Sequence, residues 1–215
     1  MPSRQGLFVT LEGVEGAGKT SRCRSLVAAL RDRGLNVVRT REPGGPAVAE
    51  GIRNLLLDPD IPVPPPTELL LYLAGRAANV ELVVRPALEA GSCVVCERYS
   101  DSTLAYQVGG RGLDEEAIVR AQTIATGGLT PDVTILLDLD PRIGLARLDS
   151  EGGGKDRIER ESLDFHDRVR RRYLEMARDE DRFLIVDATV PQAEQDAAIL
   201  EHVMRSINPN TESGD

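Results

Sequence analysis

The stretch Gly13-Val14-Glu15-Gly16-Ala17-Gly18-Lys19-Thr20 carries the strongest structural information in this chain. It matches the pattern G-x-x-x-x-G-K-[ST], in which the backbone N–H groups of a glycine-rich loop surround the terminal phosphates of a nucleotide. In this pattern the lysine reaches the β- and γ-phosphate oxygens, and the hydroxyl of the last residue is placed on Mg²⁺. We therefore predict that residues 13–20 bind a nucleotide together with Mg²⁺.

The segments on both sides of this loop support the same interpretation. Residues 7–11 are mostly apolar and predict a buried strand that runs into the loop. Beyond the loop, apolar side chains recur with helical spacing at positions 23, 26, 27 and 30. The resulting helix would point the positive end of its dipole at the phosphates. Strand, glycine loop and helix in this order are the context that the motif requires.

Composition limits the possible functions. The chain has 215 residues, 41% hydrophobic and 28% charged, which is enough for one globular domain with a sizeable core. Its net charge of −9 argues against a general nucleic-acid-binding protein, because affinity for the phosphate backbone requires a basic surface. An anionic substrate must therefore be bound by local arginines. The N-terminus shows no secretory signal pattern and no apolar run reaches membrane-spanning length, so we expect a cytoplasmic protein without a membrane partner.

Further strand patterns at 36–40, 92–96, 133–137 and 183–187 alternate with helical segments. This alternation predicts an α/β fold, a five-stranded parallel sheet with helices on both faces. The helices are expected at 46–57, 69–90, 114–126, 141–148, 162–178 and from the last strand to about 207, and the second of these should bend near Pro86. We assign residues 1–208 to a single domain with a mobile lid at about 149–162, and residues 209–215 to a disordered tail.

The three cysteines do not form a disulfide framework. Cys93 and Cys96 have C-x-x-C spacing, but they lie in an apolar run that we interpret as a strand. Residues three apart in a strand point to opposite faces of the sheet. A redox or metal-binding role for this pair is therefore not expected.

Three motifs follow the glycine loop along the chain: T-R-E-P-G-G at 40–45, E-R-Y-S-D-S-T at 97–103 followed by A-Y-Q at 105–107, and D-R-I-E at 156–159. Together with E-G-V-E-G-A-G-K-T at 12–20, they resemble the thymidylate kinase family of nucleoside monophosphate kinases in order and spacing over nearly the whole chain. The resemblance implies transfer of the γ-phosphoryl group of MgATP to the 5′-phosphate of dTMP, giving dTDP. It also implies a P-loop kinase fold, a mobile lid and, usually, a homodimer.

The resemblance assigns the phosphate-binding residues. Lys19 and the amides of Gly13, Val14, Glu15, Gly16, Ala17, Gly18 and Thr20 would hold the phosphates of ATP. Arg98 and Arg41 would fix the acceptor phosphate, a task that suits the forked guanidinium group. Glu97 occupies the position that holds or orients Mg²⁺ through water, beside Thr20. Many relatives carry Asp at the position of Glu97, so this chain has the longer side chain.

The resemblance also predicts where the transition-state arginine lies. In one subgroup of the family this arginine is inside the glycine loop, whereas in the bacterial-type subgroup the lid provides it. Here the loop position is Gly16, and the lid contains Arg157 with Lys155 nearby. We therefore assign this role to Arg157, which would act only when the lid closes and excludes water.

The binding site for the thymine base and the sugar follows from the same resemblance. Tyr72 would stack on thymine, and Arg76, four residues later, would contact O4 of the base. Thr103 would hydrogen-bond the edge of the base. Tyr106 would crowd the 2′ position and so select deoxyribose, while Glu15 would accept a hydrogen bond from the 3′-OH.

Without the resemblance, several of these residues have simpler interpretations. Tyr72 has the helical spacing of a core residue. Arg157 lies in a polar loop, where an arginine is usually a solvated charge. Asp138 and Asp140 resemble a metal-binding carboxylate pair, but Pro141 favours a helix cap. The arginines at 168 and 170–172 favour a solvated helix face over nucleic-acid binding. We assign no role to His166 or Gln107.

Two other functions remain open from the residues alone. The chain could act on a different nucleoside monophosphate, or it could be a P-loop ATPase or GTPase that switches a protein partner. A switch needs no acceptor-phosphate site and would hydrolyse nucleotide without any monophosphate. The combination of residues 97–99 with an arginine-bearing lid favours the kinase.

Overall fold

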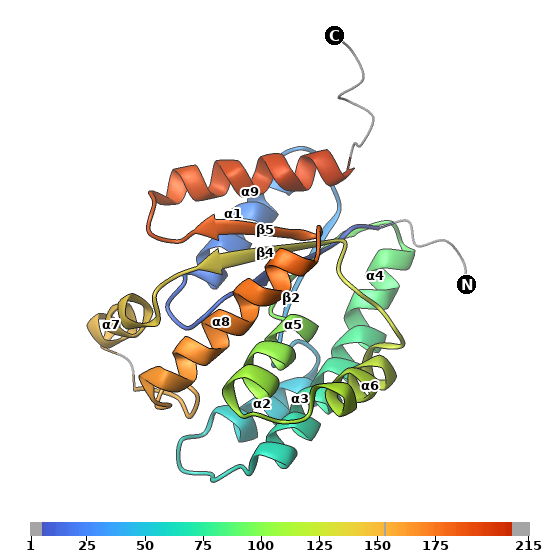
Figure 1. Cartoon of the computed structure of the whole chain (residues 1–215). Helices are drawn as coiled ribbons and strands as arrows, with labels where there is room; N and C mark the ends of the chain where they lie inside the picture. Colours follow the sequence, from blue (N-terminus) through green and yellow to red (C-terminus); the bar gives the residue numbers. More distant parts are fainter. Residues whose placement is uncertain (1–5, 153, 208–215) are drawn as a thin grey trace.

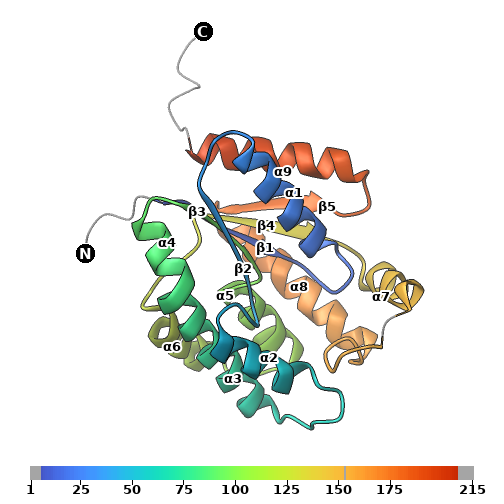
Figure 2. The ribbon, with the colours of Figure 1, turned by 180° about the vertical axis from the view of Figure 1, so that it is seen from behind.

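The computed structural model describes residues 6–152 and 154–207. The five strands are β1 (Phe8–Glu12), β2 (Val37–Arg41), β3 (Cys93–Glu97), β4 (Val133–Asp138) and β5 (Phe183–Asp187). They form one parallel sheet in the order β2-β3-β1-β4-β5, so the strand that enters the glycine loop lies at the centre (Figures 1 and 2). The predicted fold and the five predicted strands are confirmed, with boundaries that differ by one residue at most.

Helices cover both faces of the sheet (Figures 1 and 2). The helices α1 and α9 lie on one face, while α8, α4 and the elements packed on them lie on the other. The α-helices are α1 (Lys19–Arg31), α2 (Ala47–Leu57), α3 (Pro65–Asn79), α4 (Arg85–Glu89), α5 (Ser100–Thr103), α6 (Glu115–Thr126), α7 (Pro141–Glu151), α8 (Leu163–Asp179) and α9 (Gln192–Ile207). Among the described residues, no helix has the length and apolar character needed to span a bilayer.

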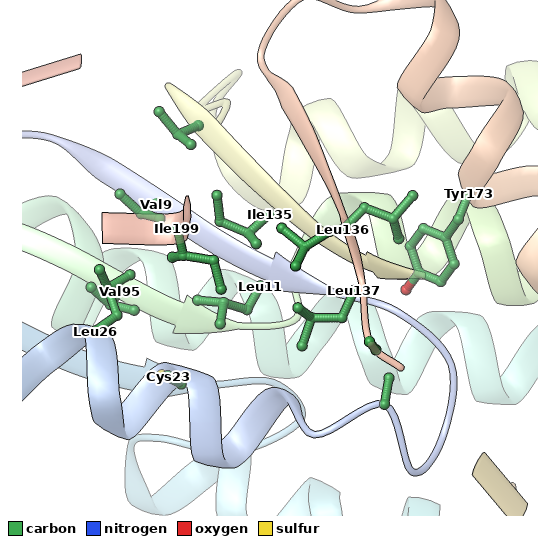
Figure 3. Close-up of a cluster of buried hydrophobic side chains, with 14 of the residues drawn as sticks. Val9, Leu11, Cys23, Leu26, Val95, Ile135, Leu136, Leu137, Tyr173 and Ile199 are labelled. Atoms are coloured by element: carbon green, nitrogen blue, oxygen red, sulfur yellow. The ribbon is translucent and has the colours of Figure 1, made fainter. Parts of the chain in front are cut away.

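Successive side chains of a strand point to opposite faces of the sheet, and this alternation decides which of two buried clusters each side chain joins. Val9 and Leu11 on β1 pack into the larger cluster of buried side chains, which Figure 3 shows beside α1, whereas Phe8 faces a smaller cluster under α4. Cys93 and Cys96 separate in the same way, one to each cluster, and both are free thiols. This opposite orientation is the one predicted for residues three apart in a strand.

The long helix predicted over 69–90 differs from the structure. The helical segment begins at Pro65 in α3, passes through a π-helical turn, η1 (Val80–Val84), and ends as α4. The irregular turn therefore precedes Pro86 instead of being centred on it. Because Pro86 lies in the first turn of α4, its missing N–H is not needed there, and the Arg85 N–H bonds instead to the carbonyl of Val80 in the wider turn.

A second helical segment was not predicted at all. After β3, the chain forms the short helix α5 and a second π-helical segment, η2 (Leu104–Gly110). The predicted cap of α6 is confirmed, because the Asp114 carboxylate accepts a hydrogen bond from the Ala117 N–H. The predicted tail at 209–215 and Gly153 of the predicted lid lie outside the described residues.

Candidate active site

A cavity of about 490 Å³ opens at the carboxyl ends of the strands, where ligands bind in open α/β sheets. Residues from the glycine loop and from the motifs at 40–45, 97–103 and 156–159 line it together. Of the residues predicted for the site, only Gly13, Val14, Ala17 and Arg157 are not part of its lining.

The glycine loop has the backbone that the motif requires. Gly13, Gly16 and Gly18 have positive φ angles of 141°, 69° and 87°. The amino group of Lys19 folds back and donates to the carbonyls of Gly13 and Val14, at 3.0 and 2.7 Å. Burial, with the charge of Arg98 adding to it, lowers the pKa of Lys19 to about 8. An anion in the loop would compensate this buried positive charge.

Thr20 and Glu97 meet across the start of α1 and the end of β3. The Thr20 hydroxyl donates to Glu97 Oε1 at 2.8 Å. No group of three or more His, Cys, Asp and Glu side chains that could hold a metal exists among the described residues. One hydroxyl and one carboxylate nevertheless fit Mg²⁺, which keeps several waters and takes its remaining ligands from substrate phosphates.

Arg98 lies in a constrained position directly after β3. Its φ angle is +66°, the left-handed region that costs a non-glycine residue about 1–2 kcal/mol. Its guanidinium donates to Glu15 Oε1 at 2.7 Å and lies over the Tyr106 ring at 4.9 Å. Burial by itself would lower the pKa of Arg98, but Tyr106 and Glu15 raise this pKa well above its usual value. Arg98 is therefore a fixed cation at the cavity wall.

Glu15 is held by several groups at once. The Tyr106 hydroxyl lies 2.7 and 2.8 Å from its two carboxylate oxygens, and Nδ1 of the buried His166 lies 3.3 Å from Oε2. Burial alone would raise the pKa of Glu15, but Arg98, the contact with His166 and Lys19 hold it well below its usual range. The structure thus places His166, to which the sequence assigned no role, beside Glu15.

Arg76 is fully buried and already bound to protein groups. Its Nε donates to Glu42 at 2.7 Å, its Nη1 to Thr103 and Gln122 at 2.8 and 2.9 Å, and its Nη2 to the Tyr99 carbonyl at 2.8 Å. One N–H of Nη2 remains for a ligand. Because the Thr103 hydroxyl accepts from Arg76, its own proton is free to be donated into the cavity.

Tyr72 is partly buried and lines the cavity. Arg41 also lines it, half-exposed, with its Nη2 at 3.0 Å from Glu50. The sequence did not single out Arg53, another cavity residue, which donates to the Pro43 carbonyl at 2.7 Å. Arg53 lies in the middle of α2 and outside every motif. The only signal in the sequence that could have identified it is its place in the helix that follows the T-R-E-P-G-G segment.

The structure does not bring Arg157 to the glycine loop. Its Nη1 lies 2.5 Å from Glu68, a fully buried carboxylate on α3, and its Nε donates to the Leu56 carbonyl at 2.8 Å. Gln107 and Arg111 bind the same carboxylate. The lid residues that do line the cavity are Asp156, Ile158 and Glu159.

The carboxylates at the end of β4 and directly after it are not part of the site. Asp140 caps α7 by accepting from the Arg142 N–H at 2.8 Å, as predicted. Asp138 forms a two-point ion pair with Arg170, at 2.7 and 2.8 Å. Neither residue lines the cavity.

Comparison with known proteins agrees with this geometry. The sequence model of the thymidylate kinase family matches residues 11–199. The chain is 50% identical over 196 residues to the thymidylate kinase of Deinococcus radiodurans, covering 91% of this chain and 95% of that protein. It is 48% identical over 183 residues to the thymidylate kinase of Carboxydothermus hydrogenoformans, covering 85% and 89%. It is also 50% identical over 185 residues to that of Thermomicrobium roseum, covering 86% and 88%.

Proposed function

The chain belongs to the thymidylate kinase family and transfers a phosphoryl group from ATP to dTMP, and we propose how its residues divide this work. The observation that carries the proposal is that one cavity joins the glycine loop to a second group of cations. A nucleotide switch needs only the first of these. Phosphoryl transfer needs both, because catalysis rests on positioning two anionic substrates and neutralising their charge.

The donor nucleotide is bound by residues 13–20 and the N-terminus of α1. Lys19 exchanges its two carbonyl partners for the β- and γ-phosphate oxygens of ATP. Thr20 and Glu97 would hold Mg²⁺, an ion that keeps several waters and otherwise binds substrate phosphates. The ion supplies charge neutralisation on the transferred group.

The acceptor phosphate is bound by Arg98 and Arg41, with Arg53 as a third cation of the same cavity. A fixed guanidinium such as Arg98 suits this task, because little order has to be imposed when the phosphate arrives. The thymine base stacks on Tyr72 and receives hydrogen bonds from Thr103 and from the remaining N–H of Arg76.

The sugar is read by Glu15 and Tyr106. Their mutual hydrogen bonds fix both side chains before the substrate binds. Glu15 then accepts from the 3′-OH, and the Tyr106 ring leaves no room for a 2′-OH. An analogue that lacks such partners leaves buried polar groups unpaired, so discrimination of this kind can be steep.

Arg157 is the arginine that stabilises charge in the transition state. Because Arg157 pairs with Glu68 on α3, this ion pair has to break before Arg157 can reach the phosphates. Gly16 supports this role indirectly, since a Cβ there would lie 2.2 Å from the carbonyl oxygen of Gly144, so the loop has no room for an arginine.

The proposal includes a homodimer in the cytoplasm. Exposed apolar side chains lie on α3, η1 and α6, and α3 contacts both η1 and α6. The side chains are Leu70, Leu82, Val119 and Ile124. The free, buried thiols of the chain are typical of a reducing compartment.

The test is the initial rate of ADP release from MgATP with dTMP, dUMP, dCMP, AMP or no acceptor under identical conditions. We expect release to depend on dTMP. Preference for another monophosphate would refute the roles of Tyr72, Arg76 and Thr103. Equal release without any acceptor would refute the kinase assignment in favour of a nucleotide switch.

A further inference from the structure

Glu12, the last residue of β1, is a buried carboxylate that the assigned roles leave unused. It is fully buried, and no arginine or lysine of the described residues forms an ion pair with it. Its two oxygens accept three hydrogen bonds, from the Tyr99 N–H at 2.7 Å, the Ser102 hydroxyl at 2.6 Å and the Tyr173 hydroxyl at 2.8 Å.

The same groups contact Arg98. Its Nη1 lies 3.3 Å from Ser102 Oγ and 3.5 Å from the Tyr173 hydroxyl. Tyr99, whose N–H binds Glu12, directly follows Arg98, and Arg98 has the unusual φ of +66°. Glu12 therefore anchors both the backbone beside Arg98 and the two hydroxyls that face its guanidinium.

The charge of Glu12 determines how these hydroxyls point. An ionised carboxylate can only accept hydrogen bonds, so it favours the orientation in which the hydroxyls of Ser102 and Tyr173, which also lie 2.8 Å from each other, both point their protons at it. Their lone pairs are then available to the N–H groups of Arg98. A neutral group at this position competes with Arg98 for the same lone pairs.

We propose that Glu12 is a positioning residue for Arg98, which it holds through Ser102 and Tyr173 in the orientation that receives the phosphate of dTMP. The inference rests on the proposed role of Arg98 as the acceptor-phosphate ligand. Glu12 itself does not line the cavity and acts only through these neighbours.

The proposal predicts a pH dependence near neutrality. Burial, followed by the charge of Asp101, raises the pKa of Glu12 to about 7. Above this pH the carboxylate is ionised and orients the hydroxyls, whereas below it the orientation is lost. The other titratable or charged groups around it are Lys19 on α1, Arg76 on α3, Cys96 on β3, Arg98 after β3 and Tyr173 on α8.

The experiment compares the binding of dTMP and thymidine to the full chain and to Glu12→Gln by isothermal titration calorimetry. Thymidine lacks the phosphate, so it does not use Arg98 as a phosphate ligand. We expect the substitution to weaken dTMP binding about tenfold or more and to change thymidine binding by less than about twofold. Equal weakening of both ligands would show a general structural role and overturn the proposal, as would unchanged binding of both.

Calorimetric titrations with dTMP between pH 6 and 8 add a second measurement, whose result a purely structural role of Glu12 would not change. The ratio of dTMP affinities, parent over Glu12→Gln, cancels the titration of the nucleotide itself and should rise with pH through about 7. In Asp101→Asn the midpoint of this rise should move to lower pH, because a negative charge near Glu12 is removed. A ratio that does not change with pH would overturn the proposal.

Two further variants separate the possible failures. If Glu12→Gln does not fold, Ser102→Ala combined with Tyr173→Phe removes the two hydroxyls instead, and the same loss confined to dTMP is expected. Arg98→Ala tests the premise. Unchanged preference of Arg98→Ala for dTMP over thymidine would refute the role of Arg98 itself, whereas a loss in Arg98→Ala without any loss in Glu12→Gln would refute only the inference about Glu12.

Discussion

The position of Gly16 in the glycine loop has no room for a side chain. Its φ is +69°, and a Cβ at this position would meet the carbonyl oxygen of Gly144 at 2.2 Å and the Gly144 Cα at 2.6 Å. From the sequence alone, Gly16 marked only the absence of an arginine. The structure adds the reason, since the backbone of α7 occupies the space that a side chain would need.

The steric cost at Gly16 is testable against a matched glycine. Gly34 has a similar φ of +81°, but nothing lies within 4 Å of its Cβ position. Gly34→Ala should lower the free energy of unfolding by about 1 kcal/mol, from backbone strain alone. Gly16→Ala should cost a further 1–3 kcal/mol or so, because α7 has to shift. Chemical denaturation measures both, and equal losses would contradict the close packing.

Single residues of the site were predictable only where a motif carries them. Lys19, Thr20 and Glu97 follow from segments that end in the cavity, and the structure brings them together. The partners of Glu12 were not predictable, because Tyr173 lies 161 positions further along the chain. A pattern in one sequence records spacing along an element, whereas such a contact depends on how two distant elements pack.

At the scale of elements, the predictions succeeded where an apolar run or a helix cap is clear, whereas the long helix predicted over 69–90 is interrupted by η1. Strands with continuous apolar runs and helices with clear caps agree with the structure. The segment 100–110 was missed because it is short, polar at its start and ends in two glycines. It forms α5 and η2, and η2 packs on α8. This segment supplies Thr103 and Tyr106 to the cavity, so a weak local pattern contributes much of the site.

The lid residues are held by partly buried ion pairs to Glu68 on α3 and to Arg111, which directly follows η2. Glu68 binds Arg157, and Arg111 joins Glu68 to Glu161. Glu68→Gln keeps the volume but removes the charge, so hydrogen exchange of residues 156–161 should become faster. Exchange in β1 reports global stability, and Glu50→Gln, which loses a partly exposed pair with Arg41, serves as the control. Unchanged exchange in the lid of Glu68→Gln would contradict this prediction.

The same lid provides the test of Arg157. Arg157→Ala should lower kcat by a factor on the order of 10³, with little change in dTMP affinity, because the arginine acts on the transition state. Lys155→Ala is the matched control, since Lys155 pairs with Asp149 and does not line the cavity. Steady-state kinetics with MgATP and dTMP measures both variants. A turnover number of Arg157→Ala equal to that of the parent would show that another group performs this task.

At the scale of the whole molecule, a chain with a net charge of −9 has a cavity rich in arginine. The opposite signs coexist because acidic partners hold the arginines in place, as Glu15 holds Arg98 and Glu50 holds Arg41. An anionic substrate therefore meets arginines that these carboxylates already hold in place. The overall charge gives no steering toward the cavity, and local geometry provides the affinity.

We expect the exposed apolar side chains to form the interface of the proposed homodimer. Ile124 on α6 is 86% exposed, and Leu70 on α3 and Leu82 on η1 are each 63% exposed. Burying such side chains against a second copy removes apolar area from water, at about 25 cal/mol per Å². Ile124→Glu combined with Leu70→Glu should place charges in this interface and convert the dimer to monomers.

Light scattering after size-exclusion chromatography measures this change. We expect the parent to have twice the mass of the 23.4 kDa chain and the double variant to have the mass of one chain. Ile143→Glu is the control, because Ile143 is also exposed but lies on α7, at the opposite end of the molecule from α6 (Figures 1 and 2). A parent protein with the mass of one chain would refute the homodimer. A dimer that survives in the double variant but dissociates in Ile143→Glu would move the interface to α7.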